Sequence, residues 1–385
     1  MELGIQVHNN CQYVSCDVAI IGGGISGLSL SVDLKKRGYN VVVIEKGNYP
    51  RHKVCGEYIS MESYNYLKML CPALNNLHLP LIKNFKLSST GKKEFSTELG
   101  LGGIGISRYL LEDLLFKEAQ KLGVIFSLNN KANEINYHEG DEIYSIKTGN
   151  EVISAQLVCN SSGRKSNLET AGKIKNLKGT NYVGVKYHVK LNSQQDQIEI
   201  HNFPGGYCGI SSIEDGKSCL CYIVNSKKLK QAGNSIEQME KTFLFENKNL
   251  KRIFTTAEFI FREPVTISGI NFEIKKPVDQ HSFFLGDSAG SIAPITGNGM
   301  SQGFRSAFVL AENIDRYLSK AITKNLLNTS YDQFWNKEFA TRIKLSRHLQ
   351  KLSEYPFLTR MTIGLFNSFP SLANRVIGQT HGKPF

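Results

Sequence analysis

Apolar runs of strand length and segments of helical spacing alternate along the chain. Residues 18–21, 41–44 and 282–285 are short apolar runs, typical of strands that are buried on both faces. Helical patterns follow the first run as far as Arg37 and fill most of the chain from about residue 300 onward. Alternation of apolar and polar residues instead predicts an antiparallel sheet, with strands at 182–191, 198–202, 207–213 and 218–224.

The first apolar run leads into a glycine-rich turn, Gly22-x-Gly24-x-x-Gly27, and the second run ends at Glu45. Strand, turn, helix, strand and acid stand in the order of the dinucleotide-binding βαβ unit. The glycines permit a tight turn and let a pyrophosphate approach the amides at the helix N-terminus. Glu45 can accept hydrogen bonds from ribose hydroxyls, and its charge disfavours a 2′-phosphate. The stretch therefore predicts binding of an adenine dinucleotide.

A second glycine-rich segment follows the apolar run at 282–285. Gly286-Asp287 ends that strand, and a loop with Gly297 and Gly299 opens a helix from about Met300. Asp287 is placed to accept a hydrogen bond from a sugar-chain hydroxyl. The helix N-terminus is placed to stabilise negative charge.

Charged and reactive side chains are concentrated in the segment after Glu45. Three cations, a thiol and a carboxylate occupy residues 51–57, which indicates a functional loop, with a solvated loop as the alternative. Farther on, Ser107 is the expected N-cap of an amphipathic helix that carries Arg108 in its first turn. A cation there opposes the helix dipole, which indicates a nearby anion unless Arg108 is simply exposed.

The composition narrows the class of protein and its environment but does not indicate a function. The 385 residues are 41% apolar and 21% charged, as in a globular protein, and no apolar run has the length of a membrane span. Eight cysteines without CxxC spacing predict reduced thiols, no metal site and a cytoplasmic location. Of the net charge of +12, residues 316–385 carry eleven Lys and Arg against three acids. This favours a solvated helix face, leaves peripheral membrane contact open, and has no accompanying nucleic-acid motif.

Taken together, these motifs resemble those of the FAD-dependent oxidoreductases of the para-hydroxybenzoate hydroxylase fold, most closely the geranylgeranyl-reductase-like branch. The resemblance extends over about residues 17–315. It implies that the dinucleotide is FAD and that the first glycine motif and Glu45 hold its AMP half. For the rest of FAD, it implies contacts from residues that the motifs share with the family: Arg51, Arg108, Gly286, Asp287, Gly297 and Gly299.

Four departures from related families limit the reaction. The hydroxylases carry Asp-Gly, linked to both FAD and NAD(P)H, where this chain has Ser162-Gly163. This departure weakens the case for NAD(P)H, so the expected electron donor is either NAD(P)H or a reduced electron-carrier protein. Of the aromatic substrate motif of archaeal geranylgeranyl reductases, only Tyr207 is present. Halogenases need a Trp-rich motif, and Trp335 is the sole tryptophan. No cysteine follows Cys221 to hold an iron–sulfur cluster.

We therefore expect an α/β (α+β) fold, with an antiparallel-sheet substrate domain inserted into a Rossmann-like FAD-binding domain. A short extension is expected before the first strand, and a helical region at the C-terminal end. The expected ranges are 1–16 for the extension, 17–60, 100–175 and 271–315 for the FAD-binding domain, 61–99 and 176–270 for the substrate domain, and 316–385 for the helical region.

The resemblance favours hydride transfer through the flavin to a small lipophilic or conjugated substrate, as in C=C reduction. Cys55, Glu57 and Tyr207 are candidates for proton donation or positioning beside the ring, each with a purely structural role as its alternative. Two other functions stay open: a monooxygenase acting on an aromatic or polyketide-type substrate, and a non-catalytic FAD-binding partner protein. The oligomeric state is not predicted.

Overall fold

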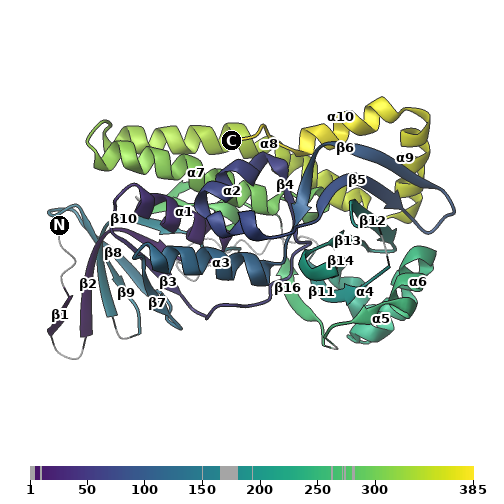
Figure 1. The fold of residues 1–385 in the computed structure, drawn as a ribbon, viewed down its shortest axis with the longest axis horizontal. Helices are drawn as coiled ribbons and strands as arrows, with labels where there is room; N and C mark the ends of the chain where they lie inside the picture. The colour runs from purple at the N-terminus through teal and green to yellow at the C-terminus, as the bar shows by residue number, and fades with distance from the viewer. Residues whose placement is uncertain are drawn as a thin grey trace.

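Two sheets lie side by side along the long axis of the molecule, with helices packed on both (Figure 1). The computed structural model describes residues 5–8, 11–149, 151–164, 181–192, 194–261, 263–270, 272, 275–279 and 282–385. The expected α/β (α+β) fold class is confirmed. The two sheets draw their strands from interleaved parts of the chain, so neither is formed by one continuous segment.

The first sheet holds the glycine fingerprint at the carboxyl end of its central strand. Its main path is β17-β18-β10-β2-β3-β7, parallel from β18 to β7, with β1, β8 and β9 attached. The strands are β1 (Ile5–His8), β2 (Cys11–Ile21), β3 (Val41–Glu45), β7 (Ile125–Leu128), β8 (Glu134–His138), β9 (Ile143–Lys147), β10 (Glu151–Asn160), β17 (Val278–Asp279) and β18 (Ser282–Phe284).

Both faces of this sheet are covered, which explains its uninterrupted apolar strands. Val18 and Ile20 belong to the core shared with α1 (Ile25–Lys36), α3 (Arg108–Lys121) and α7 (Gly299–Leu318). Ala19 and Ile21 point the other way, into a core shared with the β8–β9 hairpin. Successive β2 side chains therefore serve two cores, as the two-residue period of a strand requires.

The second sheet has the order β15-β11-β14-β13-β12-β5-β6-β4, with β16 also paired to β11. One face forms a core with α4 (Ser226–Gln231), α5 (Ile236–Thr242) and α6 (Lys248–Thr256), and the other face is turned to the cofactor motifs. The strands are β4 (Tyr58–Ser60), β5 (Leu81–Ser88), β6 (Glu94–Gly105), β11 (Tyr182–Lys190), β12 (Gln197–Phe203), β13 (Gly206–Ser212), β14 (Ser218–Asn225), β15 (Glu258–Phe259) and β16 (Val265–Ile270).

Three helices after α7 span the two sheets. The long α8 (Lys324–Leu352) packs on the first core through the fully buried Trp335 and Phe339. Then α9 (Pro356–Ser368) and α10 (Pro370–Thr380) lie beside β5 and β6 at the far end of the molecule, where Ile363 is fully buried (Figure 1). Among the described helices, none has both the length and the hydropathy for crossing a bilayer.

Several expected boundaries are wrong. Residues 11–16 are part of β2 rather than an extension, because Val14 and Cys16 alternate inward and pair with β10. The segment 61–80, assigned to the substrate domain, contains α2 (Tyr64–Leu70), which packs into the core of α1 and α7 instead. Residues 100–105 extend β6 of the second sheet. Residues 165–180, within the expected FAD-binding domain and its junction, lie outside the described residues.

Candidate cofactor site and adjoining cavity

The first glycine turn leaves the N-terminus of α1 open. Gly22 has φ of +99°, and a Cβ on Gly27 would fall on the Gly22 carbonyl oxygen, so both positions require glycine. Gly24 is the N-cap, no side chain caps the helix, and its first turn holds no acid. The first amides of α1 are therefore available to an anion.

Glu45 is buried at the end of β3 and faces this turn. Its carboxylate accepts hydrogen bonds from the amides of Gly23 at 2.7 Å and Gly47 at 3.0 Å, and pairs with Arg51 Nη1 at 2.6 Å. Burial favours the neutral acid, but the hydrogen bond and charge of Arg51 outweigh it, so the pKa of Glu45 lies below its ordinary value. An ionised acceptor thus stands beside the glycine turn, where the ribose was predicted.

A cluster of three cations surrounds one fully buried acid, Glu112. Arg51 Nε and Lys53 Nζ lie 3.4 and 3.3 Å from its Oε2, and Arg108 Nε donates a 2.9 Å hydrogen bond to its Oε1. The Lys53 ammonium is also 3.5 Å from the position that a Cβ on Gly24 would occupy. Arg51 also pairs with Glu45, so two carboxylates face three cations, and one positive charge is left over next to an uncapped helix N-terminus. This combination fits a diphosphate.

Glu112 was not identified as a site residue from the sequence. Its spacing of four residues from Arg108, which places both side chains on one face of α3, was a usable signal. The neighbouring cations hold the pKa of Glu112 below its ordinary value against the effect of burial. Burial lowers the pKa of Lys53 to about 8, with Glu112 acting in the opposite direction. The predicted conflict between Arg108 and the helix dipole is thus resolved partly by an acid within α3 itself.

The second glycine motif lies against the first. Gly286 has φ of +59°, and a Cβ added to it would fall on Ser26 Oγ in the first turn of α1. Asp287 is partly exposed and accepts a 3.1 Å hydrogen bond from Arg164 Nε. Arg164 Nη1 is buried and has no hydrogen-bond partner among the described residues. A polar ligand spanning the two motifs would supply an acceptor for it.

The loop after Asp287 presents a second open helix N-terminus. Gly297 has φ of +69°, and the Tyr58 ring lies 3.2 Å from where its Cβ would be. Helix α7 starts at Gly299 without a side-chain cap or an acid in its first turn. The Asn298 side chain instead donates a 2.5 Å hydrogen bond to the carbonyl of Thr380, at the end of α10.

Glu57 anchors the cation-rich loop to the second sheet. Its fully buried carboxylate pairs with Lys186 Nζ, lies 2.6 Å from His188 Nε2 and accepts the Arg108 amide at 2.8 Å. Burial opposes its ionisation, but the hydrogen bond from His188 and the charge of Lys186 outweigh this effect, so its pKa is lowered. Glu57 and His188 form a ligand-type triad with Cys219, but Lys186 already supplies the cation that neutralises the carboxylate.

The rest of the loop lies along the same sheet face. Ser211 Oγ donates a 2.7 Å hydrogen bond to the Gly56 carbonyl, and Cys219 Sγ lies 3.2 Å from the Cys55 carbonyl oxygen. The strand alternation of β13 places Tyr207 on the face that carries Ser211. Between them, a Cβ on Gly209 would meet only the Cys221 carbonyl, at 3.7 Å. The strip of sheet between the Cys55 loop and Tyr207 is therefore uncrowded.

Beyond Tyr207 lies an apolar cavity of about 160 Å³ between this sheet face, the 295–297 loop and the C-terminal helices. Tyr207 is buried in its wall, and burial raises the pKa of its phenol well above the ordinary value. No Asp, Glu, Lys or Arg lies among the lining residues that the structure describes. The lining includes Phe85, Leu87, Ile198 and Ile200 from the sheet, Gly297 from the loop, and Leu349, Phe366, Val376 and Ile377 from the helices.

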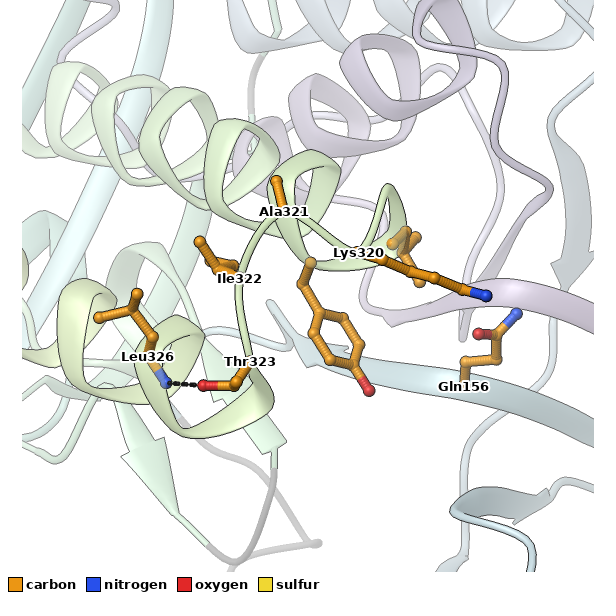
Figure 2. A pocket seen from close by; sticks show the side chains of 8 residues that line it. Gln156, Lys320, Ala321, Ile322, Thr323 and Leu326 are labelled. Atoms are coloured by element: carbon orange, nitrogen blue, oxygen red, sulfur yellow. Dashed lines mark hydrogen bonds between the residues drawn. The ribbon is translucent and has the colours of Figure 1, made fainter.

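A second hollow lies far from the glycine motifs. It is formed by Gln156 of β10 and the turn from α7 to α8, where the Leu326 amide donates a 3.3 Å hydrogen bond to Thr323 Oγ1 (Figure 2). Tyr317 and Lys320 also line it, at the end of α7 opposite to Gly299. The length of α7 separates it from the 297–299 loop by about 30 Å, so it is not part of the cofactor site.

Comparison with known proteins assigns the chain to a family. The sequence profile of the FAD binding domain family matches residues 15–334. A digeranylgeranylglycerophospholipid reductase of Methanococcus vannielii is 22% identical, covering 88% of each chain. A kynurenine 3-monooxygenase of Cytophaga hutchinsonii is 23% identical, covering 95% of this chain and 92% of its own. The solved structure of the flavin-dependent brominase Bmp2 superposes with a TM-score of 0.77 at 18% identity, over 94% of this chain and 92% of that chain, which establishes the shared fold.

Proposed function

The chain belongs to the FAD binding domain family, and we propose that this FAD-dependent oxidoreductase reduces a lipophilic or conjugated substrate held in the apolar cavity. The observation that supports this substrate class is the cavity lining. It includes the 295–297 loop, and no Asp, Glu, Lys or Arg is among the lining residues that the structure describes. Apolar walls with a few convergent polar groups are typical of sites for apolar small molecules.

The residues of both glycine motifs fit FAD. The first turn, Glu45 and the cations beside Glu112 would hold the AMP half and the diphosphate. Asp287 and the open N-terminus of α7 would hold the ribityl chain and the ring. Bound there, FAD supplies two-electron redox chemistry, and the protein supplies position and electrostatics.

The side chains near the cavity differ in what they can contribute. Glu57 is fully engaged with Lys186 and His188, so we propose that it positions the loop and donates no proton. Tyr207 stays protonated because its pKa is raised, and it lies in the cavity wall, where it can hydrogen-bond a substrate or donate a proton. Cys55 is a partly exposed thiol on the loop side of the uncrowded strip.

The test is an anaerobic reduction of the purified flavoprotein. NADH, NADPH and a reduced ferredoxin are titrated separately while the flavin spectrum is recorded, which also identifies the electron donor. A prenyl alkene is then added, and reoxidation of the flavin together with a saturated product is the expected result. A flavin that is reduced by a donor but never reoxidised by such alkenes would contradict the reductase proposal.

A monooxygenase is the second candidate, favoured by the similarity to kynurenine 3-monooxygenase along nearly the whole chain. Its distinguishing property is oxygen consumption stimulated by an aromatic substrate, with a hydroxylated product. Admitting oxygen to the reduced protein with such a substrate separates the two functions. Product formation without oxygen supports the reductase, and strict dependence on oxygen supports the monooxygenase.

We also propose a reducing, cytoplasmic environment for the protein. Seven of the eight cysteines are free: Cys16, Cys55, Cys71, Cys159, Cys208, Cys219 and Cys221. Cys219 and Cys221 lie opposite Ser211 and Gly209, on the sheet face turned to the loop. Burial raises the pKa of both thiols, which keeps them protonated and unreactive. Fractionation of the native host followed by immunodetection would test this location.

A further inference from the structure

The outer surface of α9 and α10 carries an apolar ridge of large side chains. Phe357, Met361 and Leu365 follow one another at intervals of four residues and are 62%, 58% and 45% exposed. Phe369 and Leu372 extend the ridge onto α10. Side chains four apart lie on one face of a helix, so Phe357, Met361 and Leu365 form a continuous strip on α9, which is followed along the chain by the exposed Phe369 and Leu372. Isolated exposed apolar residues are ordinary, whereas a contiguous strip marks an interaction surface.

The ridge is not explained by packing within the chain. The opposite side of α9 already provides its core contacts, through the fully buried Ile363 and through Phe366. A surface helix that covers a sheet normally presents polar residues outward. Here α9 is apolar on two sides. Its inner side packs on the sheet, and its outer side has no packing partner among the described residues.

The charges on the ridge helices themselves all have one sign. Residues 355–385 contain Arg360, Arg375 and Lys383 and no acid. The Arg360 side chain lies against the turn between β5 and β6, 3.1 Å from where a Cβ on Gly91 would be. That turn adds the exposed Lys92 and Lys93 to the rim. The exposed Glu94 follows these lysines, but it pairs with Lys86 Nζ at 2.9 Å. An apolar strip with a net cationic rim is complementary to the headgroups and acyl boundary of anionic lipids.

A second copy of the chain fits this face less well. A two-fold interface brings the same patch of both subunits together, so the rim cations would face their own copies. Residues 355–385 contain no acid to relieve that repulsion, and the adjacent Glu94 is already paired with Lys86. A lipid surface imposes no such conflict, and the long Arg and Lys side chains can lie beside the apolar strip with their charges at the headgroups.

We propose that the apolar ridge of α9 and α10 docks the protein on an anionic membrane surface. The same two helices line the cavity from the inside, through Thr362, Phe366, Val376 and Ile377. A lipophilic substrate would therefore reach the cavity from the bilayer across a single layer of helices; this route, unlike the docking itself, rests on the proposed function.

The test is co-sedimentation of the FAD-loaded protein with vesicles, without substrate. We expect binding to vesicles of phosphatidylglycerol and phosphatidylcholine, and weak binding to phosphatidylcholine alone. Changing Phe357, Met361 and Leu365 together to serine should weaken binding about tenfold or more. Replacing Lys92, Lys93 and Arg360 by serine should weaken it by roughly a hundredfold on anionic vesicles.

The matched control changes three exposed apolar residues elsewhere to serine: Met69, Ile267 and Leu326, which are 47%, 42% and 46% exposed. Flavin content and the circular dichroism spectrum show whether each variant is folded. Equal vesicle binding by the control and ridge variants would overturn the proposal. So would a concentration-dependent dimer that the ridge substitutions abolish, in a protein that does not bind vesicles. Because no turnover is measured, failure of the proposed reaction leaves this result intact.

Discussion

The charge of Lys53 should make FAD affinity depend on pH. Its ammonium lies 3.3 Å from Glu112 and beside Gly24, where the diphosphate is expected, and burial lowers its pKa to about 8 in the free protein. A bound diphosphate favours the charged amine, so the complex keeps a proton that the free protein loses above pH 8. Affinity should therefore be constant below that pH and fall above it, by up to about tenfold per pH unit.

The size of the effect follows from the pKa. With a value of about 8, roughly three-quarters of the free protein carries a charged Lys53 at pH 7.5, and roughly 3% does so at pH 9.5. The association constant should thus decrease about 25-fold between these pH values. Titration of the apoprotein with FAD at fixed ionic strength, followed by quenching of flavin fluorescence, measures it directly.

Two variants isolate the contribution of this side chain. Lys53→Arg keeps the charge throughout the range and should remove the difference between the two pH values. Lys53→Met should bind about tenfold to a hundredfold more weakly at pH 7.5, as expected for loss of a charge-assisted contact, and with little further change at pH 9.5. A wild-type affinity that stays flat, or falls equally in Lys53→Arg, would refute the placement of Lys53 at the phosphates.

Three further predictions concern neighbouring residues. Lys186→Met leaves Glu57 buried without its cation and should lower the free energy of unfolding by about 3–5 kcal/mol, measured by urea titration. The pKa of Glu57 is lowered in the folded protein, so the ionised carboxylate stabilises the fold above about pH 4.5 and this stabilisation is lost as the pH falls further. The difference between the variant and the wild type should therefore shrink below about pH 4.5. Asp287→Ala should lose flavin during purification while Asp287→Asn retains part of it; a fully yellow alanine variant would exclude a ribityl contact. Cys55→Ser should keep its flavin and turn over more slowly, and an unchanged rate would remove the thiol from the mechanism.

The parts of the fold that depend on local pattern were predictable. Gly22, Gly24 and Gly27 between two buried strands are typical of a dinucleotide-binding turn. The resemblance of Gly286-Asp287 to a second family motif then identified the dinucleotide as FAD. The inserted sheet also followed from simple alternation of apolar and polar residues. In contrast, the true length of β2 was hidden, because its first half pairs with residues about 140 positions later in the chain.

The details of the site depend on contacts between distant residues and were not predictable. Glu57 was a candidate for proton donation or positioning, with a structural pairing to Arg51 or Lys53 as the alternative. It lies fully buried between Lys186 and His188, about 130 residues away. A buried lysine inside a strand gives no signal of its own in a sequence. Likewise Arg164 was visible only as one residue in a polar segment, and folding brings it to Asp287.

The hydrogen bond from Asn298 to Thr380 has a consequence for biosynthesis. Asn298 precedes the first turn of α7, so the loop expected to carry the flavin ring is completed by a carbonyl 82 residues farther along the chain. The nearby Gly382 amide and Phe385 amide also return to Glu62. A growing polypeptide could shape its AMP-binding turn early, but the ring loop must wait until these residues leave the ribosome. Cofactor loading should accordingly follow the synthesis of α10 and the residues after it.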